Sequence, residues 1–433
     1  MSTDPDGPRP FSREDLLAAY DGQLRRRVPH VWPVGVAYES DGEVVRIHYG
    51  THGVVDHGAL TVQELDELVH RQRAVFADRG EPIEWKAYGH DSPGLPSALL
   101  AAGFSAGWRR SLLIAPIDVL RSEISSSVHA LEREPDREFG ERAKQLAVLG
   151  EPHRVPLSQL EADGAQFADL STLVLRTGDR IRGVGWAHHL TRTEFIEIGG
   201  LTSPLPEFLP YWAGWSRRGP QRYFGWEPPE ARFMVAEADG TRRDMLIKAG
   251  FQEVSTVQSY HWTPPKAPPS TRPVTELLGD PEYKRIWDQV GAQLSFKPSV
   301  TDFPGIEEPA PSVTWRLDQR DTGLPLETLE ERLTEILWRK LPAAVAAEDL
   351  YWLDWNHVGY RFDPRRVGGQ GQPGWPGSAY PDGDYYLYVT GDLRLGTFGH
   401  PWEQTLCVFG AALLAEVEAE ITDLLGPPLR RRR

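Results

Sequence analysis

The feature that most constrains the fold of this 433-residue chain is an internal repeat within its first 262 residues. Each copy reads, in order, as a strand, an acidic turn, a short helix, the tripeptide Ala-Gly-Phe and a second strand. The segments of the first copy are Ile83–Lys86, His90-Asp91, Leu99–Ala102, Gly103-Phe104 and Leu112–Ala115, and those of the second are Phe233–Ala236, Asp239-Gly240, Leu246–Ala249, Gly250-Phe251 and the run that ends at Trp262. A glycine adopts the left-handed backbone that ends a helix, and the phenylalanine after it packs back onto a sheet. The matched order predicts two halves built on one α/β plan, with a chance likeness of common helix–Gly–strand corners as the alternative.

Further elements precede the repeated segment in both halves. In the first half, Val34–Tyr38 and Val44–Tyr49 flank a Ser-Asp-Gly turn, which is typical of a β-hairpin. Thr61 and Glu64 then form a capping box, which predicts a helix that runs to Gly80. In the second half, short apolar stretches predict a meander of three strands. These stretches are Leu173–Leu175, Val184–Ala187 and Phe195–Ile198.

Changes in composition divide the chain into segments. Residues 263–274 hold five prolines and predict a stiff, extended linker. Residues 118–150 are charged and predict a helical connector that Pro135 interrupts. The segments 11–117, 151–262 and 275–433 are then expected to be domains. The predicted fold class is α/β (α+β), with two mixed-sheet units in tandem and a C-terminal α+β domain.

Composition excludes several classes of protein. The 47 basic and 62 acidic residues give a net charge of −15, which argues against binding to nucleic acid or anionic membranes. The single cysteine, Cys407, excludes an intrachain disulfide framework and a multi-cysteine metal site. No apolar run approaches the roughly 18 residues of a membrane span, and Met1–Pro10 is polar. We therefore expect a soluble, cytoplasmic protein, and the composition leaves its oligomeric state open.

The corner after each acidic turn resembles the C-terminal half of the GNAT (Gcn5-related) N-acetyltransferase fold. Residues 151–262 carry the resemblance best, with Gly199-Gly200-Leu201-Thr202 similar to the end of the family's central strand. Residues 11–117 look like a more diverged copy, as in tandem GNAT proteins of high-GC bacteria. The resemblance implies transfer of an acetyl group from acetyl-CoA to an amine of a small molecule or a protein. It also implies that the cofactor lies where two strands splay apart, beside Leu201 and Thr202.

One motif that the resemblance implies is missing. The family holds the cofactor's pyrophosphate with Gln/Arg-x-x-Gly-x-Gly/Ala at the start of a helix, where backbone N–H groups point at the anion. Residues 203–212 contain no Gly-x-Gly, and Pro210 removes a backbone donor. Literal matches at Arg180–Gly185 and Arg366–Gly371 fall in a predicted hairpin and a loop, so we interpret them as chance.

The catalytic residues that the resemblance implies are Glu197 and Glu194, because a glutamate on the central strand often deprotonates the amine. Tyr260 and His261 are weaker alternatives, and two exposed strand carboxylates are the structural alternative. The family's tyrosine acid is replaced by Leu246. Two hypotheses follow: an acetyltransferase with an altered pyrophosphate grip, or an inactive GNAT-shaped scaffold whose C-terminal domain binds a ligand or protein.

The C-terminal segment contains seven of the chain's 15 tryptophans. Thr328 and Glu331 predict a capped helix, and Gly410 precedes a second amphipathic helix. Four strands are expected between them: Tyr351–Trp355, Gly359–Phe362, Tyr385–Val389 and Leu406–Phe409. The segment resembles a bacterial domain family of unknown function with similar Asp-Gly-Asp-Tyr-Tyr and Gly-His-Pro-Trp-Glu runs, which supplies no activity.

Four residues of these runs carry titratable side chains. His357, Asp384, His400 and Glu403 form a metal or acid–base cluster if the strands bring them together, although their spacing matches no standard zinc pattern. The alternative is that they have structural roles, in which the aspartates cap backbone amides. No metal site is assigned from the sequence.

Overall fold

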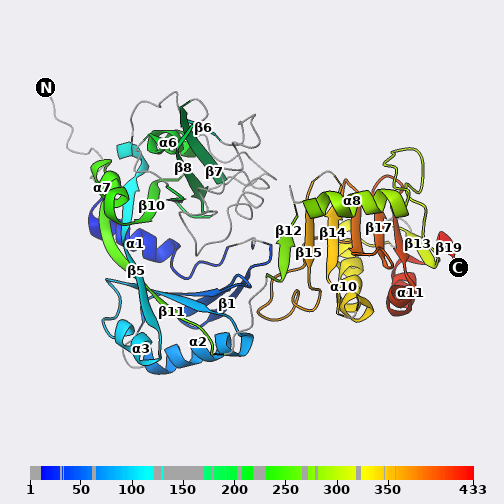
Figure 1. Cartoon of the computed structure of the whole chain (residues 1–433), viewed down its shortest axis with the longest axis horizontal. Coiled ribbons are helices and arrows are strands. Elements are labelled where there is room, and N and C mark those ends of the chain that lie inside the picture. Colours follow the sequence, from blue (N-terminus) through cyan, green and yellow to red (C-terminus); the bar gives the residue numbers. More distant parts are fainter. Residues whose placement is uncertain are drawn as a thin grey trace. The chain divides into compact units, whose positions relative to one another are not determined.

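The structure is a computed structural model that describes residues 11–29, 32, 34–60, 65–120, 128–130, 170–177, 180–190, 192–201, 207–217, 231–265, 272–277, 281–317, 323–345, 347–355 and 357–433. The chain forms two compact units: the first comprises Met1–Pro33 and Tyr38–Ser270, and the second Val34–Ala37 and Thr271–Arg433 (Figure 1). Both contain a large sheet with helices against it, which confirms the predicted α/β (α+β) class. Among the described helices, none combines the length and apolar character needed to span a membrane.

The first unit is built on one eleven-stranded sheet with the order β1-β2-β3-β4-β11-β5-β10-β9-β8-β7-β6. Its strands are β1 (Ala37–Asp41), β2 (Val44–His48), β3 (Gly53–His57), β4 (Ile83–Tyr88), β5 (Ser105–Pro116), β6 (Val128–Ala130), β7 (Leu170–Thr177), β8 (Arg180–His189), β9 (Phe195–Gly199), β10 (Phe233–Ala238) and β11 (Gln252–Trp262). Its helices are α1 (Arg13–Gln23), α2 (Leu65–Arg79), α3 (Leu95–Ala101), the 3₁₀ helix η2 (Ile117–Leu120), α6 (Phe208–Arg217) and α7 (Gly240–Lys248).

The two copies of the repeat exchange their last strands. β4 leads through α3 into β5, but β5 pairs with β10 of the second copy rather than with β4. Likewise β10 leads through α7 into β11, and β11 pairs with β4 of the first copy. β5 and β11 pair with each other at the centre of the sheet (Figure 1). The two halves therefore share one continuous sheet, a feature that segment boundaries in the sequence do not reveal.

The register relates the copies residue by residue. Trp85 pairs with Tyr260, and Ala236 pairs with Leu113. Tyr260 and Leu113 each lie nine residues after the phenylalanine of an Ala-Gly-Phe corner. Trp85 and Ala236 are thus equivalent positions, and so are the residues that follow them.

The corners form as the sequence predicts. Gly103 and Gly250 have φ values of 86° and 112°, a backbone conformation that favours glycine. The phenylalanines after them, Phe104 and Phe251, are 4% and 3% exposed and belong to the cores on either side. The Gly-Phe pair ends each helix and fixes it against the sheet.

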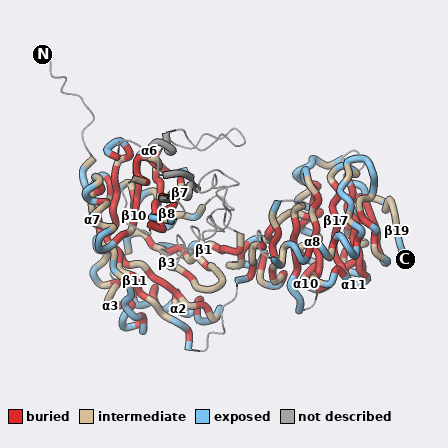
Figure 2. Tube along the Cα trace, turned by 45° about the horizontal axis from the view of Figure 1, so that its top comes forward, coloured by how far each residue is buried: buried red, intermediate tan, exposed pale blue. Residues whose placement is uncertain are grey.

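Three clusters of buried side chains hold the first unit together. α1 covers the centre of one face, where Leu16 and Tyr20 pack against β5, β10 and β11. α2 and α3 cover the other face in the first copy, and α6 and α7 cover it in the second. Figure 2 shows buried residues along the strands of this sheet. The repeat thus brings equivalent helices to equivalent places.

Other predictions for this unit have mixed outcomes. β7, β8 and β9 form the expected antiparallel meander. The predicted helix is α2, but its capping residues, Thr61 and Glu64, lie outside the described residues. The described parts of the range 118–150 belong to η2 and the strand β6, so the helical connector expected there is wrong for those residues. The strand arises because Val128–Ala130 pairs with β7, and sheet pairing outweighs local helix preference.

The second unit has an eight-stranded antiparallel sheet with the order β12-β15-β14-β16-β17-β18-β13-β19. Its strands are β12 (Val274–Glu276), β13 (Ser312–Arg316), β14 (Leu350–Asp354), β15 (Gly359–Phe362), β16 (Tyr386–Thr390), β17 (Gly396–His400), β18 (Thr405–Phe409) and β19 (Arg430–Arg432). Its helices are α8 (Pro281–Gln293), α10 (Leu326–Val345) and α11 (Ala411–Leu425). α10 and α11 pack on one face of the sheet and α8 on the other (Figure 1).

The four strands expected in this unit are present as β14, β15, β16 and β18. The predicted capping position is wrong, because α10 begins at Leu326 and Thr328 lies inside its first turn. Sequence analysis missed α8, β12, β13, β17 and β19. Of these, β12 and β19 are three residues long and lie at the edges of the sheet, where little apolar patterning is required.

Candidate functional site: a pocket where two parallel strands part

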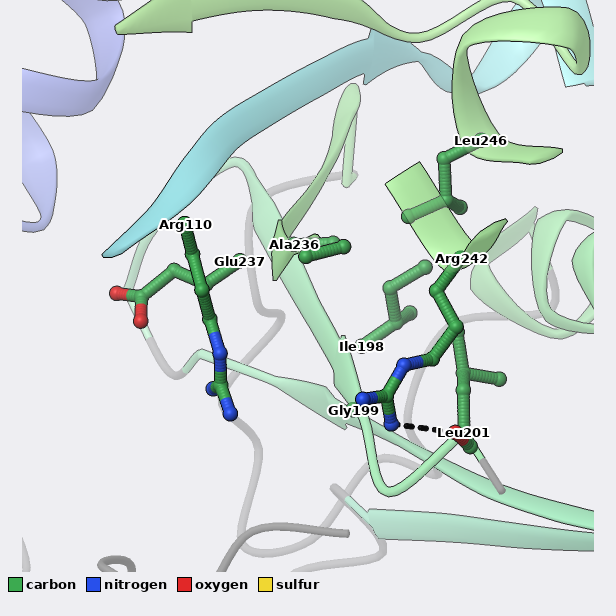
Figure 3. Close-up of a pocket in the computed structure, with 9 residues that line it drawn as sticks. Arg110, Ile198, Gly199, Leu201, Ala236, Glu237, Arg242 and Leu246 are labelled. Atoms are coloured by element: carbon green, nitrogen blue, oxygen red, sulfur yellow. Dashed lines mark hydrogen bonds between the residues drawn. The ribbon is translucent and has the colours of Figure 1, made fainter. Parts of the chain in front are cut away.

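β9 and β10 run parallel, but their pairing ends before either strand does. The last pair is Glu197 with Val235, whereas β9 continues to Gly199 and β10 to Ala238. A pocket of about 320 Å³, partly open to solvent, lies beyond that point (Figure 3). The residues that line it are Arg110, Ile198, Gly199, Leu201, Ala236, Glu237, Ala238, Arg242 and Leu246.

Two glycines allow the end of β9 to diverge. A Cβ at Gly199 would lie 2.4 Å from the ring of Trp186, which pairs with it from β8. Gly200 has a φ of 60° and turns the chain away from the strand direction. The Gly-Gly pair thus lets a bulky indole pack under the strand while the strand bends at the pocket.

Two arginines reach the pocket from different copies of the repeat. Arg242 lies in the first turn of α7, and its Nη1 donates a hydrogen bond of 3.0 Å to the Leu201 carbonyl. Arg110 lies on β5, the strand that the first copy contributes, and its guanidinium stacks over Trp108 at 4.6 Å. In Figure 3 the two side chains extend on either side of Ile198. The exchange of strands therefore supplies a cation that residues 151–262 alone lack.

The pocket has a positive and partly apolar character. Its one carboxylate, Glu237, accepts a hydrogen bond of 2.7 Å from Nζ of Lys86, which neutralises it. Ile198, Ala236 and Leu246 supply apolar walls. The start of α7 adds the positive end of a helix, because no side chain of its N-cap, Asp239, bonds to the first turn. This chemistry suits a ligand with an extended neutral stem and anionic groups.

The predicted cofactor residues are placed as follows. Leu201 is 6% exposed, lines the pocket and offers its carbonyl to Arg242. Thr202 lies outside the described residues. Leu246, which stands where the family resemblance implies a tyrosine, also lines the pocket. The side chain at this position is therefore apolar where the pocket begins.

The two predicted bases occupy different environments. Glu197 is half-buried in the last β9–β10 pair, on the face opposite to Ile196 and Ile198. Glu194 precedes β9 and bonds to Nε2 of Gln23 at 2.9 Å and to Nη1 of Arg232 at 2.8 Å. Burial raises the pKa of the Glu194 carboxyl, but the hydrogen bonds from Arg232 and Gln23 outweigh burial and lower the pKa below its usual value. A carboxylate stabilised in this way is a weak base.

The weaker alternatives, Tyr260 and His261, lie on β11 and pair with β4 of the first copy. Tyr260 is buried in the core between β4 and α3, and His261 contacts Oγ of Ser259 at 3.0 Å. Strand exchange removes both from the second copy. Sequence reasoning missed Arg110, Glu237 and Arg242, of which only Arg242 carried a signal, its position three residues after the acidic turn.

The titratable residues of the second unit separate into two groups. His357 lies 3.0 Å from Asp354 and 3.4 Å from Asp384, and the three ligand atoms lie within 4.8 Å of one another. His400 instead accepts a hydrogen bond at Nδ1 from the backbone N–H of Glu403, whose carboxylate binds Arg430. The single cluster of four expected from the sequence is therefore wrong, because β17 carries His400 away from the end of β14.

Most of the tryptophans examined in the second unit belong to its core. Trp315 and Trp352 are 0% and 5% exposed, and the rings of Trp338 and Trp375 stack at 5.6 Å. Trp402 is the exception, with 43% of its surface exposed. The tryptophan content of this unit is thus explained mainly by packing rather than by a ligand platform.

Comparison with known proteins gives two matches at the level of sequence. A family model described as "Protein of unknown function (DUF2716)" matches residues 277–414. This match confirms the resemblance of the C-terminal segment to a domain family of unknown function. The uncharacterized protein YxiI of Bacillus subtilis (strain 168) is 28% identical over 149 residues, which is 33% of this chain and 90% of that protein.

Solved structures give further matches. A GCN5-related N-acetyltransferase from Kribbella flavida is 15% identical, with 52% of this chain and 89% of that chain covered and a TM-score of 0.37. A GCN5-related N-acetyltransferase from Sphaerobacter thermophilus is 14% identical, covering 62% and 90%, with a TM-score of 0.37. A tandem GNAT protein from the clavulanic acid biosynthesis pathway is 10% identical, covering 59% and 94%, with a TM-score of 0.37. At these identities the activity has to be argued from the pocket itself.

Proposed function

We propose that the first unit binds acetyl-CoA between β9 and β10 and transfers its acetyl group to an amine of a small molecule or a protein. The observation that carries this proposal is the early end of the β9–β10 pairing beside a pocket with apolar walls and two arginines. Strands that lose their pairing leave backbone N–H and C=O groups without ladder partners. An extended ligand with amide groups, such as the pantetheine arm, can hydrogen-bond to such strand edges.

The arginines provide an alternative to the missing Gly-x-Gly. Arg242 stands at the start of α7, and Arg110 extends beside the same opening (Figure 3). Guanidinium groups bind phosphate oxygens with paired N–H donors, and a helix start favours the same charge. We assign the phosphates of the cofactor to this pair. Arg110 comes from the first copy, so the proposed site requires both copies.

We assign the base to Glu197. It occupies the last paired position of β9, next to the point where the strands part, whereas Glu194 is held by Arg232 with a lowered pKa. The cofactor supplies an activated thioester. The carboxylate of Glu197 accepts the proton of the amine as its nitrogen attacks the thioester carbonyl, and the carbon–sulfur bond breaks. The departing thiolate takes its proton from solvent, since Leu246 offers none.

The second candidate function is an inactive scaffold. Two observations favour it: residues 203–212 lack the Gly-x-Gly motif, and apolar Leu246 lines the pocket where the family resemblance implies a tyrosine acid. In that case the first unit binds no acetyl-CoA, and the second unit carries the function by binding a ligand or a protein.

Turnover measurements with acetyl-CoA and a panel of amines separate the two candidates. The proposed function predicts acetylated product from the wild-type chain. Glu197→Gln is expected to lower the rate by about 10²- to 10⁴-fold, the usual contribution of a general base. Glu194→Gln, which removes a carboxylate of the same type nearby, is expected to stay within a few-fold of wild type. Equal rates for the two variants would reject the assignment of the base, and absence of product with every amine would favour the scaffold.

A further inference from the structure

The first copy contains the counterpart of the pocket, where β3 and β4 run parallel. Their last pair is Val55 with Trp85, although β3 continues to His57 and β4 to Tyr88. Trp85 is equivalent to Ala236, so this point corresponds to the position where β9 and β10 part. The same plan thus provides the chain with two places at which a strand pair opens.

In the first copy, the side chain of Arg25 fills this opening. Arg25 follows the C-terminal end of α1, and only 3% of its side chain is exposed. Its Nε donates to the His57 carbonyl at 2.7 Å, and its Nη2 donates to the Gly58 carbonyl at 3.2 Å. The guanidinium therefore bonds to the backbone oxygens at the end of β3.

His57 closes the opening from the side of β4. Its Nε2 lies 3.0 Å from the carbonyl of Lys86, and its Nδ1 lies 3.1 Å from Nη2 of Arg25. Burial and the neighbouring Arg25 lower the pKa of His57, so the ring is neutral. A neutral ring that donates from Nε2 to Lys86 accepts at Nδ1 from Arg25, which satisfies both nitrogens. His57 thus replaces a ladder bond that the two strands no longer make.

Asp91, from the acidic turn after β4, balances the buried charge. Its two carboxylate oxygens accept hydrogen bonds of 2.8 and 3.0 Å from Arg25, and its side chain is 4% exposed. The ring of Tyr88 lies 4.2 Å from the guanidinium carbon. A buried, paired and fully hydrogen-bonded arginine is costly to displace.

The second copy differs at the corresponding positions. Gly53 pairs with Ile83, and the equivalent pair is Ile196 with Met234. Four residues further along the strand, the first copy has His57 and the second has Gly200, which has no side chain to cross the opening. The opening that is filled in one copy is a pocket in the other.

We propose that Arg25 is a built-in ligand of the first opening, so that the first copy holds no cofactor and each chain binds one acetyl-CoA. The number of cofactors rests on the proposed function, whereas the closure by Arg25 does not. In this account the first copy acts as a partner for the second, to which it supplies β5, Arg110 and Lys86.

Hydrogen exchange of backbone amides in the full chain tests the proposal. With saturating acetyl-CoA, we expect slower exchange in residues 195–201 and 233–242 and no change in residues 53–58 and 83–91. Calorimetry on the same sample should give one cofactor per chain. Protection of both openings, or two cofactors per chain, would overturn the proposal. Protection of neither would refute the proposed function and leave the closure to be decided by the variants below.

Variants test the closure without any cofactor. Arg25→Ala is expected to speed exchange in residues 53–58 and 83–91 by at least about tenfold, because it removes four hydrogen-bond partners. Arg26→Ala is the matched control, since it removes a neighbouring exposed arginine that bonds to Gly42. If Arg25→Ala does not fold, Asp91→Asn weakens the same ion pair while keeping its shape. Exchange in both segments at the wild-type rate would show that the bridge does not close the opening.

Discussion

Lys86 and Glu237 occupy equivalent positions in the two copies of the repeat, and they bind each other with Nζ 2.7 Å from Oε1. Each directly follows one of the equivalent residues Trp85 and Ala236. Their side chains are 18% and 9% exposed, so the pair is largely shielded from water. A wall of the second copy's pocket thus depends on a cation of the first copy.

This ion pair is expected to couple the two halves energetically. Lys86→Met should lower the free energy of unfolding by about 1–3 kcal/mol, because it leaves Glu237 without its partner. Glu237→Gln should have a smaller effect. A double-mutant cycle measured by urea denaturation should give a coupling energy on the order of 1 kcal/mol. Strictly additive effects would show that the contact contributes nothing.

Strand exchange predicts that the second copy does not form its sheet alone. In a fragment of residues 151–433, β10 loses β5 and β11 loses β4, which leaves two unpaired strand edges. Amides of β9 and β10 should exchange rapidly in this fragment and regain protection when residues 1–150 are added. Slow exchange in the fragment alone, with β10 paired to β11, would contradict the account.

Gly199 is expected to tolerate no side chain. A Cβ there would lie 2.4 Å from the ring of Trp186, and overpacking of this kind costs about 1–3 kcal/mol. Gly199→Ala should therefore lower the midpoint of urea unfolding. Gly291→Ala on α8 is the control, because nothing lies within 4 Å of its added Cβ. An unchanged midpoint for Gly199→Ala would mean that the indole can move aside.

Stability is expected to fall as the pH is lowered from about 6.5 to 4. His189 is 2% exposed, and burial followed by the charge of Arg27 lowers its pKa to about 4. The unfolded chain binds a proton near the ordinary pKa of about 6.5, so stability is complete above that pH and is lost as the pH approaches 4.

The size of this loss is on the order of 3 kcal/mol for a shift of this extent. His189→Leu should make urea unfolding less dependent on pH across that interval. His70→Leu on α2 serves as a control, because His70 is exposed. An equal slope in wild type and His189→Leu would show that another group causes the pH dependence.

The sequence predicted those features that depend on neighbouring residues. The two Gly-Phe corners, the β7–β9 meander and α2 follow from local patterns that their side chains repeat in the structure. Leu201 could also be predicted, since the resemblance marks the end of β9. These features need only the residues within one segment.

The remaining features depend on pairing between distant segments. Arg110 reaches the pocket only because β5 pairs with β10, and no local pattern indicates which copy a strand joins. The same exchange carries Tyr260 and His261 away from the pocket. Arg25 and Asp91 lie 66 residues apart, and their bridge becomes visible only when β3 and β4 are seen to part.

The central claim is that the pocket between β9 and β10 binds acetyl-CoA through Arg242. Calorimetric titration of the full chain with acetyl-CoA tests it most directly. We predict one cofactor per chain, binding at least about tenfold weaker in Arg242→Ala, because a lost charge-assisted hydrogen bond costs roughly 1.5–3 kcal/mol. Lys248→Ala, which removes an exposed cation from the same helix, should bind as wild type does. Absence of heat at millimolar acetyl-CoA, or equal affinities of all three proteins, would contradict the account.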